Sequence, residues 1–288
     1  MRIAAVHAAD GKIFGTLSDD EFRPLLMNGA PVRDLRDVIA LLEAGPDRLQ
    51  HGTPVALSSQ TLAAPVGPLT KNVVCVGKNY HEHAREFARS GVDQSGDKQE
   101  SPEFPVVFTK ATSSLADPLQ PVPASDDPTG TTDYEGELGV VIGKRCSKVS
   151  AEEALDFVFG YTVVNDVTAR ALQQRHKQWF LGKSLDGFCP VGPWLVTADE
   201  MGPLDGQMLT TAVNGEPRQS APLRDMIFDT PTIIATVSAY VTLEPGDLIA
   251  TGTPAGVGIG FQPQRFLVPG DIVTVAIEGI GELTNPIS

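Results

Sequence analysis

The chain has 288 residues and carries 22 Lys and Arg against 36 Asp and Glu, a formal net charge of −14. This charge repels a phosphate backbone and argues against nucleic acid as a partner. No apolar run reaches the roughly 18 residues of a membrane span, and the three cysteines are widely spaced without a CxxC pair. We therefore expect a soluble, cytoplasmic protein without disulfides, in which an anionic substrate needs a metal ion or placed Lys and Arg.

The N-terminal part shows strand and helix signals in close succession. Residues 2–7 and 12–17 predict two strands joined at Asp10-Gly11, a pair that favours a tight hairpin turn. Apolar residues in 32–44 recur with helical spacing, which predicts a helix. The Pro- and Gly-containing stretch APVGP that follows at 64–68 indicates a linker. We therefore expect a small N-terminal domain, residues 1–68, and a second domain, residues 69–288.

The second part alternates short strands with a few helices. A polar stretch from Val92 to Glu103 lacks apolar periodicity, so we expect it to be mobile and to act as a lid. Helices are expected from Ser150, where Glu153 completes a capping box, from about Val167 to His176, and from Thr230-Pro231 to about Tyr240. Because the remaining strands are short and separated by Gly/Pro turns, the sequence predicts a β-rich α+β fold.

Several carboxylates gather in otherwise apolar strands. Glu135 and Glu137 are two residues apart in a predicted strand, so both side chains share one face with Asp133. Asp166 ends a second apolar strand, YTVVND. Adjacent buried carboxylates need a neutralising cation, and Mg²⁺ or Mn²⁺ prefers oxygen ligands. The alternative is a solvated edge strand, with Asp166 as a helix N-cap.

A histidine-rich segment, GKNYHEHARE, follows the strand VVCVG. His83 and Glu86 are three residues apart and adjacent on a helix, where the carboxylate would orient the imidazole as a base. Two alternatives remain open: His81 and His83 as metal ligands, or a solvated His–Glu pair on the surface.

Four further polar residues stand near turns or helices that could face the same pocket. Lys183 lies in WFLGKSLDGF and either faces a buried anion or extends to solvent. Arg170 and Gln173 follow Asp166 by four and seven residues, on one helix face that points to a pocket or to solvent. The glycines of TGTPAGVGIG allow backbone amides and Thr253 to approach a ligand.

Taken in order, the motifs resemble the fumarylacetoacetate hydrolase family over residues 71–287. They include GKNYHEHAREF, FTKATSSL, DYEGELGVVIGK, GYTVVNDVTAR and LEPGDLIATGTPAGVG. The resemblance implies a mixed β-sandwich roll, usually a homodimer. It also implies a role for each candidate residue: Mg²⁺ or Mn²⁺ on Glu135, Glu137 and Asp166, catalysis by His83 with Glu86, charge stabilisation by Lys183, and a substrate pocket lined by Arg170, Gln173 and Thr253.

One difference from the sequence pattern of fumarylacetoacetate hydrolase itself indicates which branch of the family the chain resembles. The aspartate ligand that precedes the catalytic histidine in fumarylacetoacetate hydrolase itself has no counterpart in VVCVGKNYHEH. The chain therefore resembles the three-carboxylate branch of acylpyruvate hydrolases, oxaloacetate decarboxylases and hydroxy-dienedioate isomerases. We expect a metal-dependent hydrolase that cleaves a C–C bond in a 2,4-dioxo acid. The alternatives are a decarboxylase or an isomerase on the same site, or a non-catalytic protein that binds 2-oxo acids.

Overall fold

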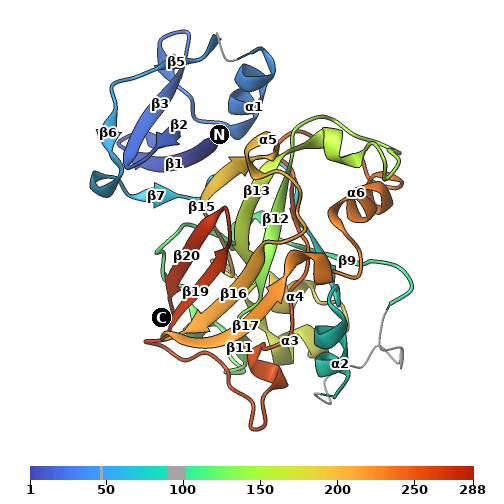
Figure 1. Ribbon diagram of the computed structural model, residues 1–288. Coiled ribbons are helices and arrows are strands. Elements are labelled where there is room, and N and C mark those ends of the chain that lie inside the picture. The colour runs from blue at the N-terminus through green and yellow to red at the C-terminus, as the bar shows by residue number, and fades with distance from the viewer. Residues whose placement is uncertain (46–47, 90–101) are drawn as a thin grey trace.

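The computed structural model describes residues 1–45, 48–89 and 102–288 (Figure 1). Its N-terminal part is an antiparallel meander of β1 (Arg2–Ala8), β2 (Gly11–Ser18) and β3 (Glu21–Met27), covered by α1 (Leu35–Glu43). The two strands and the helix predicted here are confirmed. The shorter strands of this part are β4 (Ala30–Pro31), β5 (Gln50–His51), β6 (Val55–Ala56) and β7 (Leu62–Ala63).

A central sheet runs through both parts of the chain. Its strand order is β4-β3-β2-β1-β15-β13-β12-β18-β8-β9, and β1 pairs with β15 with Ile3 opposite Leu195. The two parts expected from the sequence therefore share one sheet, and their division at residue 68 stays a prediction. The strands of the second part are β8 (Val73–Gly77), β9 (Val106–Lys110), β12 (Gly136–Ile142), β13 (Val158–Asn165), β15 (Cys189–Thr197) and β18 (Leu248–Ala250).

A second, four-stranded sheet packs against the central one (Figure 1). It consists of β16 (Met208–Val213), β17 (Glu216–Pro222), β19 (Ile272–Ile277) and β20 (Gly281–Pro286). Inward-facing residues of both sheets, such as Leu138, Val163 and Val275, form one hydrophobic cluster. This strand-rich sandwich confirms the α+β fold class. Three short strands complete it: β10 (Leu115–Ala116), β11 (Thr132–Asp133) and β14 (Thr168–Ala169).

The other helices are short and lie around the sheets. They are α2 (His81–Arg89), α3 (Arg170–Arg175), α4 (Phe180–Lys183), α5 (Ala198–Met201) and α6 (Thr230–Ser238). Within the described ranges, no helix has the length and apolar character needed to cross a bilayer.

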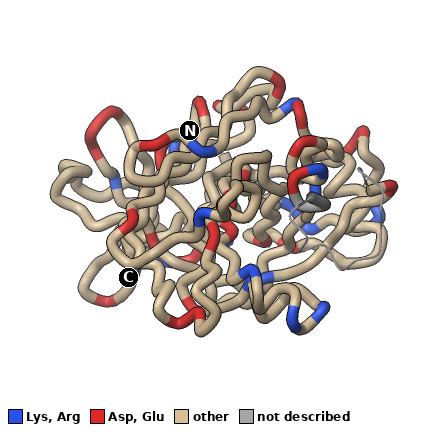
Figure 2. Tube along the Cα trace, turned by 90° about the horizontal axis from the view of Figure 1, so that it is seen from below, with Lys and Arg blue, Asp and Glu red and all other residues tan. Residues whose placement is uncertain are grey.

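In the view of Figure 2, acidic segments are scattered around the molecule with basic segments between them, so binding of an anion must depend on local charge.

Two sequence expectations about helices are wrong in detail. Ser150 Oγ donates to Glu153 at 3.0 Å as in a capping box, but the chain makes only a turn and a 3-10 helix at Ala154–Phe157, because β13 begins at once. The helix expected from Val167 starts at Arg170, since β14 pairs with β11 instead. Most of the polar stretch expected to be mobile lies outside the described residues.

Gly182 tests the close crossing of α3 and α4. A Cβ at Gly182 would lie 2.3 Å from the backbone nitrogen of Gln173, and the helix backbone cannot yield cheaply. We expect Gly182→Ala to destabilise the protein by about 1–3 kcal/mol and to lower the melting temperature by several degrees. The matched control is Gly206→Ala, where a Cβ meets no heavy atom within 4 Å. Equal melting temperatures for the two variants, measured by circular dichroism, would contradict this packing.

Candidate active site and metal centre

The pairing of β12 with β13 brings three carboxylates together. Glu135 and Glu137 flank Gly136 at the start of β12, and Gly136 lies opposite Asn165, the last residue of β13. Asp166 follows directly, and its amide donates to the Glu135 carbonyl at 2.8 Å. Ligand oxygens of the three carboxylates lie within 4.8 Å of one another, and all three residues are buried. The solvated-strand alternative is therefore wrong, and Asp166 is not the N-cap of α3, which is Ala169.

Buried lysines hold two of these carboxylates. Lys183 Nζ lies 2.7 Å from Glu135 Oε2 and 2.7 Å from Asp166 Oδ2. Lys110 Nζ lies 2.7 Å from Asp166 Oδ1 and 3.0 Å from the carbonyl of Val167. Lys183 is 2% exposed, so the alternative in which it extends to solvent is wrong. Sequence analysis missed Lys110, although a charged residue at the end of the apolar run VVFTK was a signal.

The carboxylates experience different electrostatic surroundings. Burial opposes ionisation of Glu135, but Lys183 and Arg170 outweigh it and lower its pKa to about 2. Burial, together with Asp166 and Glu135, raises the pKa of Glu137 well above its usual range. Glu137 accepts the Gly252 amide at 2.8 Å and takes part in none of the ion pairs among the described residues. Three hard oxygen donors, one without a cationic partner there, fit a divalent cation such as Mg²⁺ or Mn²⁺.

The histidine pair lies on α2 and faces the same pocket. His83 Nδ1 is 3.3 Å from Glu86 Oε2, and both oxygens of Glu86 accept the Gly256 amide at 3.1 and 3.2 Å. His83 is 5% exposed and lines the pocket, so a solvated surface pair is excluded. The carboxylate cluster that can hold a metal includes neither His83 nor His81. A Cβ at Gly260 would reach 1.9 Å from Glu86 Oε1, so this close approach requires glycine.

Arg170 connects the carboxylates to α3. Its Nε donates to Asp133 at 2.8 Å, and its Nη1 donates to Glu135 at 2.5 Å and to Gln173 at 3.5 Å. Its Nη2 is buried and has no hydrogen-bond partner among the residues that the structure describes. Thr253 Oγ1 accepts from Gln219 Nε2 at 2.7 Å. Arg170, Gln173 and Thr253 all line the pocket, as expected from the sequence.

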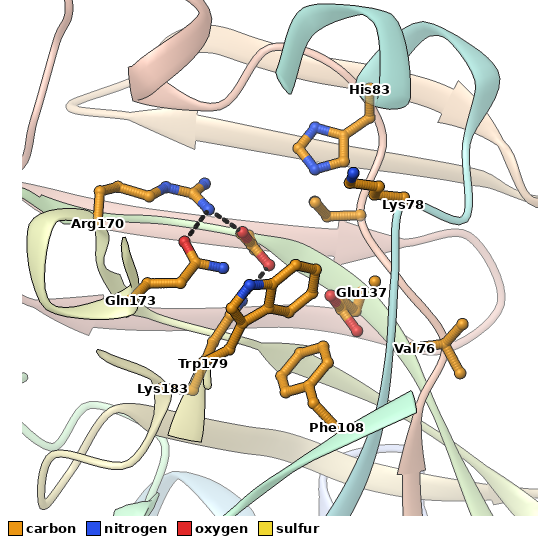
Figure 3. Close-up of a pocket in the computed structure, with 12 residues that line it drawn as sticks. Val76, Lys78, His83, Phe108, Glu137, Arg170, Gln173, Trp179 and Lys183 are labelled. Atoms are coloured by element: carbon orange, nitrogen blue, oxygen red, sulfur yellow. Dashed lines mark hydrogen bonds and ion pairs between the residues drawn. The ribbon is translucent and has the colours of Figure 1, made fainter. Parts of the chain in front are cut away.

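An aromatic wall completes this pocket. The rings of Phe108 and Trp179 meet edge to face with centroids 5.2 Å apart, and Lys183 Nζ lies 5.0 Å from the Phe108 centroid. Figure 3 shows Lys78 and His83 on the side opposite Arg170, with the aromatic wall in front. Sequence analysis did not single out Lys78, Phe108 or Trp179, because pattern alone does not separate pocket aromatics from core aromatics.

The chain is similar to a known family and to several known proteins. The family model for the fumarylacetoacetate (FAA) hydrolase C-terminal domain matches residues 72–288. The oxaloacetate tautomerase YisK of Bacillus subtilis is 48% identical over 232 residues, which cover 81% of this chain and 74% of that protein. A 2-hydroxyhepta-2,4-diene-1,7-dioate isomerase from Mycobacterium marinum superposes with a TM-score of 0.78 at 35% identity, covering 100% of this chain and 98% of that one. A fumarylacetoacetate hydrolase from Exiguobacterium antarcticum superposes with a TM-score of 0.81 at 39% identity, covering 100% and 99%.

The raised pKa of Glu137 predicts that metal binding depends on pH. A proton on Glu137 competes with a cation, so Mn²⁺ affinity should fall as the pH decreases through this raised pKa, and binding should release protons. We expect Glu137→Gln to weaken Mn²⁺ at least about 100-fold. Calorimetry in buffers of different ionisation enthalpy measures both effects. Glu216→Gln, at an exposed carboxylate, is the control. Unchanged Mn²⁺ affinity in Glu137→Gln would refute the ligand assignment.

Proposed function

The chain belongs to the fumarylacetoacetate hydrolase family, and from this premise we propose that it is a metal-dependent enzyme that interconverts the keto and enol forms of oxaloacetate. The observation that carries the proposal is the pairing of a carboxylate cluster with the buried Nη2 of Arg170 in one pocket. The carboxylate cluster can bind a divalent cation, and the guanidinium can bind a substrate carboxylate. A 2-oxo acid has oxygens for both, because its 2-oxo group can bind the cation. The similarity to the tautomerase from Bacillus subtilis supports oxaloacetate as the substrate.

Arg170 is the group that would orient the substrate. Its guanidinium is held by Asp133 and Glu135, which leaves Nη2 to donate to the substrate carboxylate, with the Gln173 amide beside it. A divalent cation on Glu135, Glu137 and Asp166 would supply Lewis-acid polarisation of the 2-oxo group when bound. A guanidinium that is already held in one orientation would align the substrate before the reaction. This alignment lowers the entropic part of the activation free energy.

His83 would transfer the proton, and Lys183 would stabilise the charge that develops. Because Nδ1 of His83 faces Glu86, Nε2 is the nitrogen that would take the proton from C3 of oxaloacetate. The C–H electron pair becomes the C2–C3 double bond, and the π electron pair of the C2 carbonyl moves onto its oxygen. The proton that His83 took from C3 is then delivered to this oxygen, which completes the enol and restores the neutral imidazole. Burial opposes the charge on Lys183, but Asp166 and Glu135 outweigh it and raise the pKa of this side chain. Lys183 therefore stays an ammonium that would donate a hydrogen bond to this oxygen as negative charge develops. No other reactant is consumed.

Hydrolysis of a 2,4-dioxo acid is the second candidate. The same His83–Glu86 pair, held at 3.3 Å, could deprotonate a water that attacks the distal carbonyl, after which the C–C bond breaks. The similarity to the Exiguobacterium hydrolase supports this candidate. Decarboxylation of oxaloacetate would need the same charge stabilisation by Lys183 but no attacking water. The four candidates, including a non-catalytic protein that binds 2-oxo acids, differ in the substrate that turns over and in whether CO₂ is released.

His83→Ala tests the proposed base. We expect its kcat for enol-oxaloacetate to fall roughly 10²–10⁴-fold, the usual contribution of a general base. Oxalate, a planar dianion like the enolate, should still bind with Mn²⁺ because Arg170 and the carboxylates are retained. The enol is followed by its ultraviolet absorbance, and acetylpyruvate hydrolysis and CO₂ release are measured on the same preparation.

Matched outcomes separate the candidates. Exposed His176 provides the control variant His176→Ala, which should keep full activity. Full tautomerase activity in His83→Ala would overturn the role of the base. Faster turnover of acetylpyruvate than of oxaloacetate by the wild type would favour the hydrolase. Mn²⁺ and oxalate binding without turnover of any of these acids would leave a binding protein.

A further inference from the structure

Asp133 is a fully buried carboxylate that neither lines the pocket nor belongs to the metal-binding cluster. Its Oδ2 accepts Arg170 Nε at 2.8 Å and the Ile259 amide at 3.0 Å. Its Oδ1 accepts the Gly258 amide at 2.7 Å and the Tyr134 amide at 2.9 Å. A carboxylate has about four acceptor positions, so these four donors use all of them. Such complete coordination fixes each donor relative to the others.

The backbone donors come from a glycine-rich loop, residues 252–259, which we call the glycine loop. It lies along the strand segment that carries the metal-binding carboxylates. At one end the Gly252 amide donates to Glu137 Oε2 at 2.8 Å, and further along Tyr134 Oη donates to the Gly256 carbonyl at 2.8 Å. Asp133 and Tyr134 therefore hold the far half of the loop, and Glu137 holds the near half.

The glycine loop in turn orients the histidine pair. The amide of Gly256 donates to both carboxylate oxygens of Glu86, and Glu86 faces His83 Nδ1. The close approach of the loop to Asp133 depends on glycine at position 258, because a Cβ there would lie 2.2 Å from the Arg265 carbonyl oxygen and 2.6 Å from Asp133 Oδ1. A shift of the loop by a fraction of an ångström would therefore change the position of Glu86 and with it the direction of the imidazole.

We propose that Asp133 is a positioning residue that aligns the two opposite sides of the pocket. On one side it fixes the guanidinium of Arg170, and on the other it fixes the glycine loop that orients Glu86. The kinetic form of the proposal rests on the proposed function. Asparagine at this position would replace two acceptor sites by an NH₂ group facing N–H donors, so it removes the alignment without removing volume.

The test compares Asp133→Asn with Tyr134→Phe. Asp133→Asn should raise KM for oxaloacetate about tenfold, through Arg170, and lower kcat about tenfold, through Glu86. Tyr134→Phe removes the bond to the Gly256 carbonyl and leaves the contacts of Arg170 in place, so it should lower kcat and leave KM within about twofold. A purely structural role would lower the amount of active enzyme in both variants without this division between KM and kcat.

The matched control is Asp247→Asn. Asp247 is also a buried carboxylate shared between a cation and an amide, with Lys71 Nζ at 2.8 Å and the Glu244 amide at 2.8 Å, and it does not line the pocket. The Asp247→Asn enzyme should keep the kcat and KM of the wild type. Equal kinetic changes in Asp247→Asn and Asp133→Asn would overturn the proposal, because any lost buried ion pair would then produce them.

Oxalate binding in the presence of Mn²⁺, measured by calorimetry, gives a readout independent of turnover. Asp133→Asn should weaken oxalate about tenfold through Arg170, and Tyr134→Phe should not. Kinetic constants and oxalate affinity within about twofold of wild type in Asp133→Asn would overturn the proposal. If the wild type binds oxalate but turns over no 2-oxo acid, the proposed function fails and the oxalate series alone decides the role of Asp133.

If Asp133→Asn does not fold, an unchanged kcat in Tyr134→Phe overturns the proposal.

Discussion

The structure depends on a buried balance of charge beneath the pocket. Four carboxyl groups and three cationic side chains are buried there: Asp133, Glu135, Glu137 and Asp166 with Lys110, Arg170 and Lys183. Among the described residues, all of them except Glu137 form ion pairs within this set. Removing a single ion from water costs several kcal/mol, so each of these groups requires its partners. With fewer cations than carboxyl groups, the same arrangement favours a divalent metal and gives an acidic protein a place for an anion.

The two sheets make this arrangement rigid. The antiparallel pairing of β12 with β13 sets Asp166 beside Glu135 through backbone hydrogen bonds, before any side-chain contact is counted. Behind the site, Gly136 lets the second sheet approach closely: a Cβ there would lie 2.3 Å from Thr211 Oγ1 and 2.8 Å from Val275 Cγ1. The carboxylates are therefore placed by packed backbone, which suits a site whose ligands must not reorganise.

The pocket has two sides that are held in different ways. On one side the lysines bond directly to carboxylates, and on the other the position of the histidine depends on a chain of contacts. Lys183 and Lys110 are locked onto carboxylates, whereas His83 depends on Glu86, and Glu86 depends on the amide of Gly256. Tautomerisation, isomerisation and hydrolysis, the reactions in the names of the similar proteins, all develop negative charge next to a carbonyl group. The same charge-stabilising side of the pocket, combined with a base in a different orientation, would catalyse each of these reactions.

The sequence alone determined which residue types are available to the site and much of the local structure. The spacing of Glu135 and Glu137 predicted a shared face, the spacing of His83 and Glu86 predicted a helical pair, and the Asp10-Gly11 turn predicted the first hairpin, because each depends on contacts within a few residues. Local patterns failed at Ser150, where an adjacent strand ended the expected helix after one turn.

Only the tertiary structure decided which charges are buried and which partners they have. Sequence spacing could not separate a solvated Lys183 from one bonded to Asp166, and it missed Lys110 altogether. Asp133 was grouped with Glu135 by its spacing, and both bond Arg170. Asp133 nevertheless lies outside the metal-binding cluster and accepts amides of the glycine loop, because its strand pairs with β14 and not with β13. Burial and long-range pairing arise when segments far apart in the chain pack together, and no short stretch of sequence contains that information.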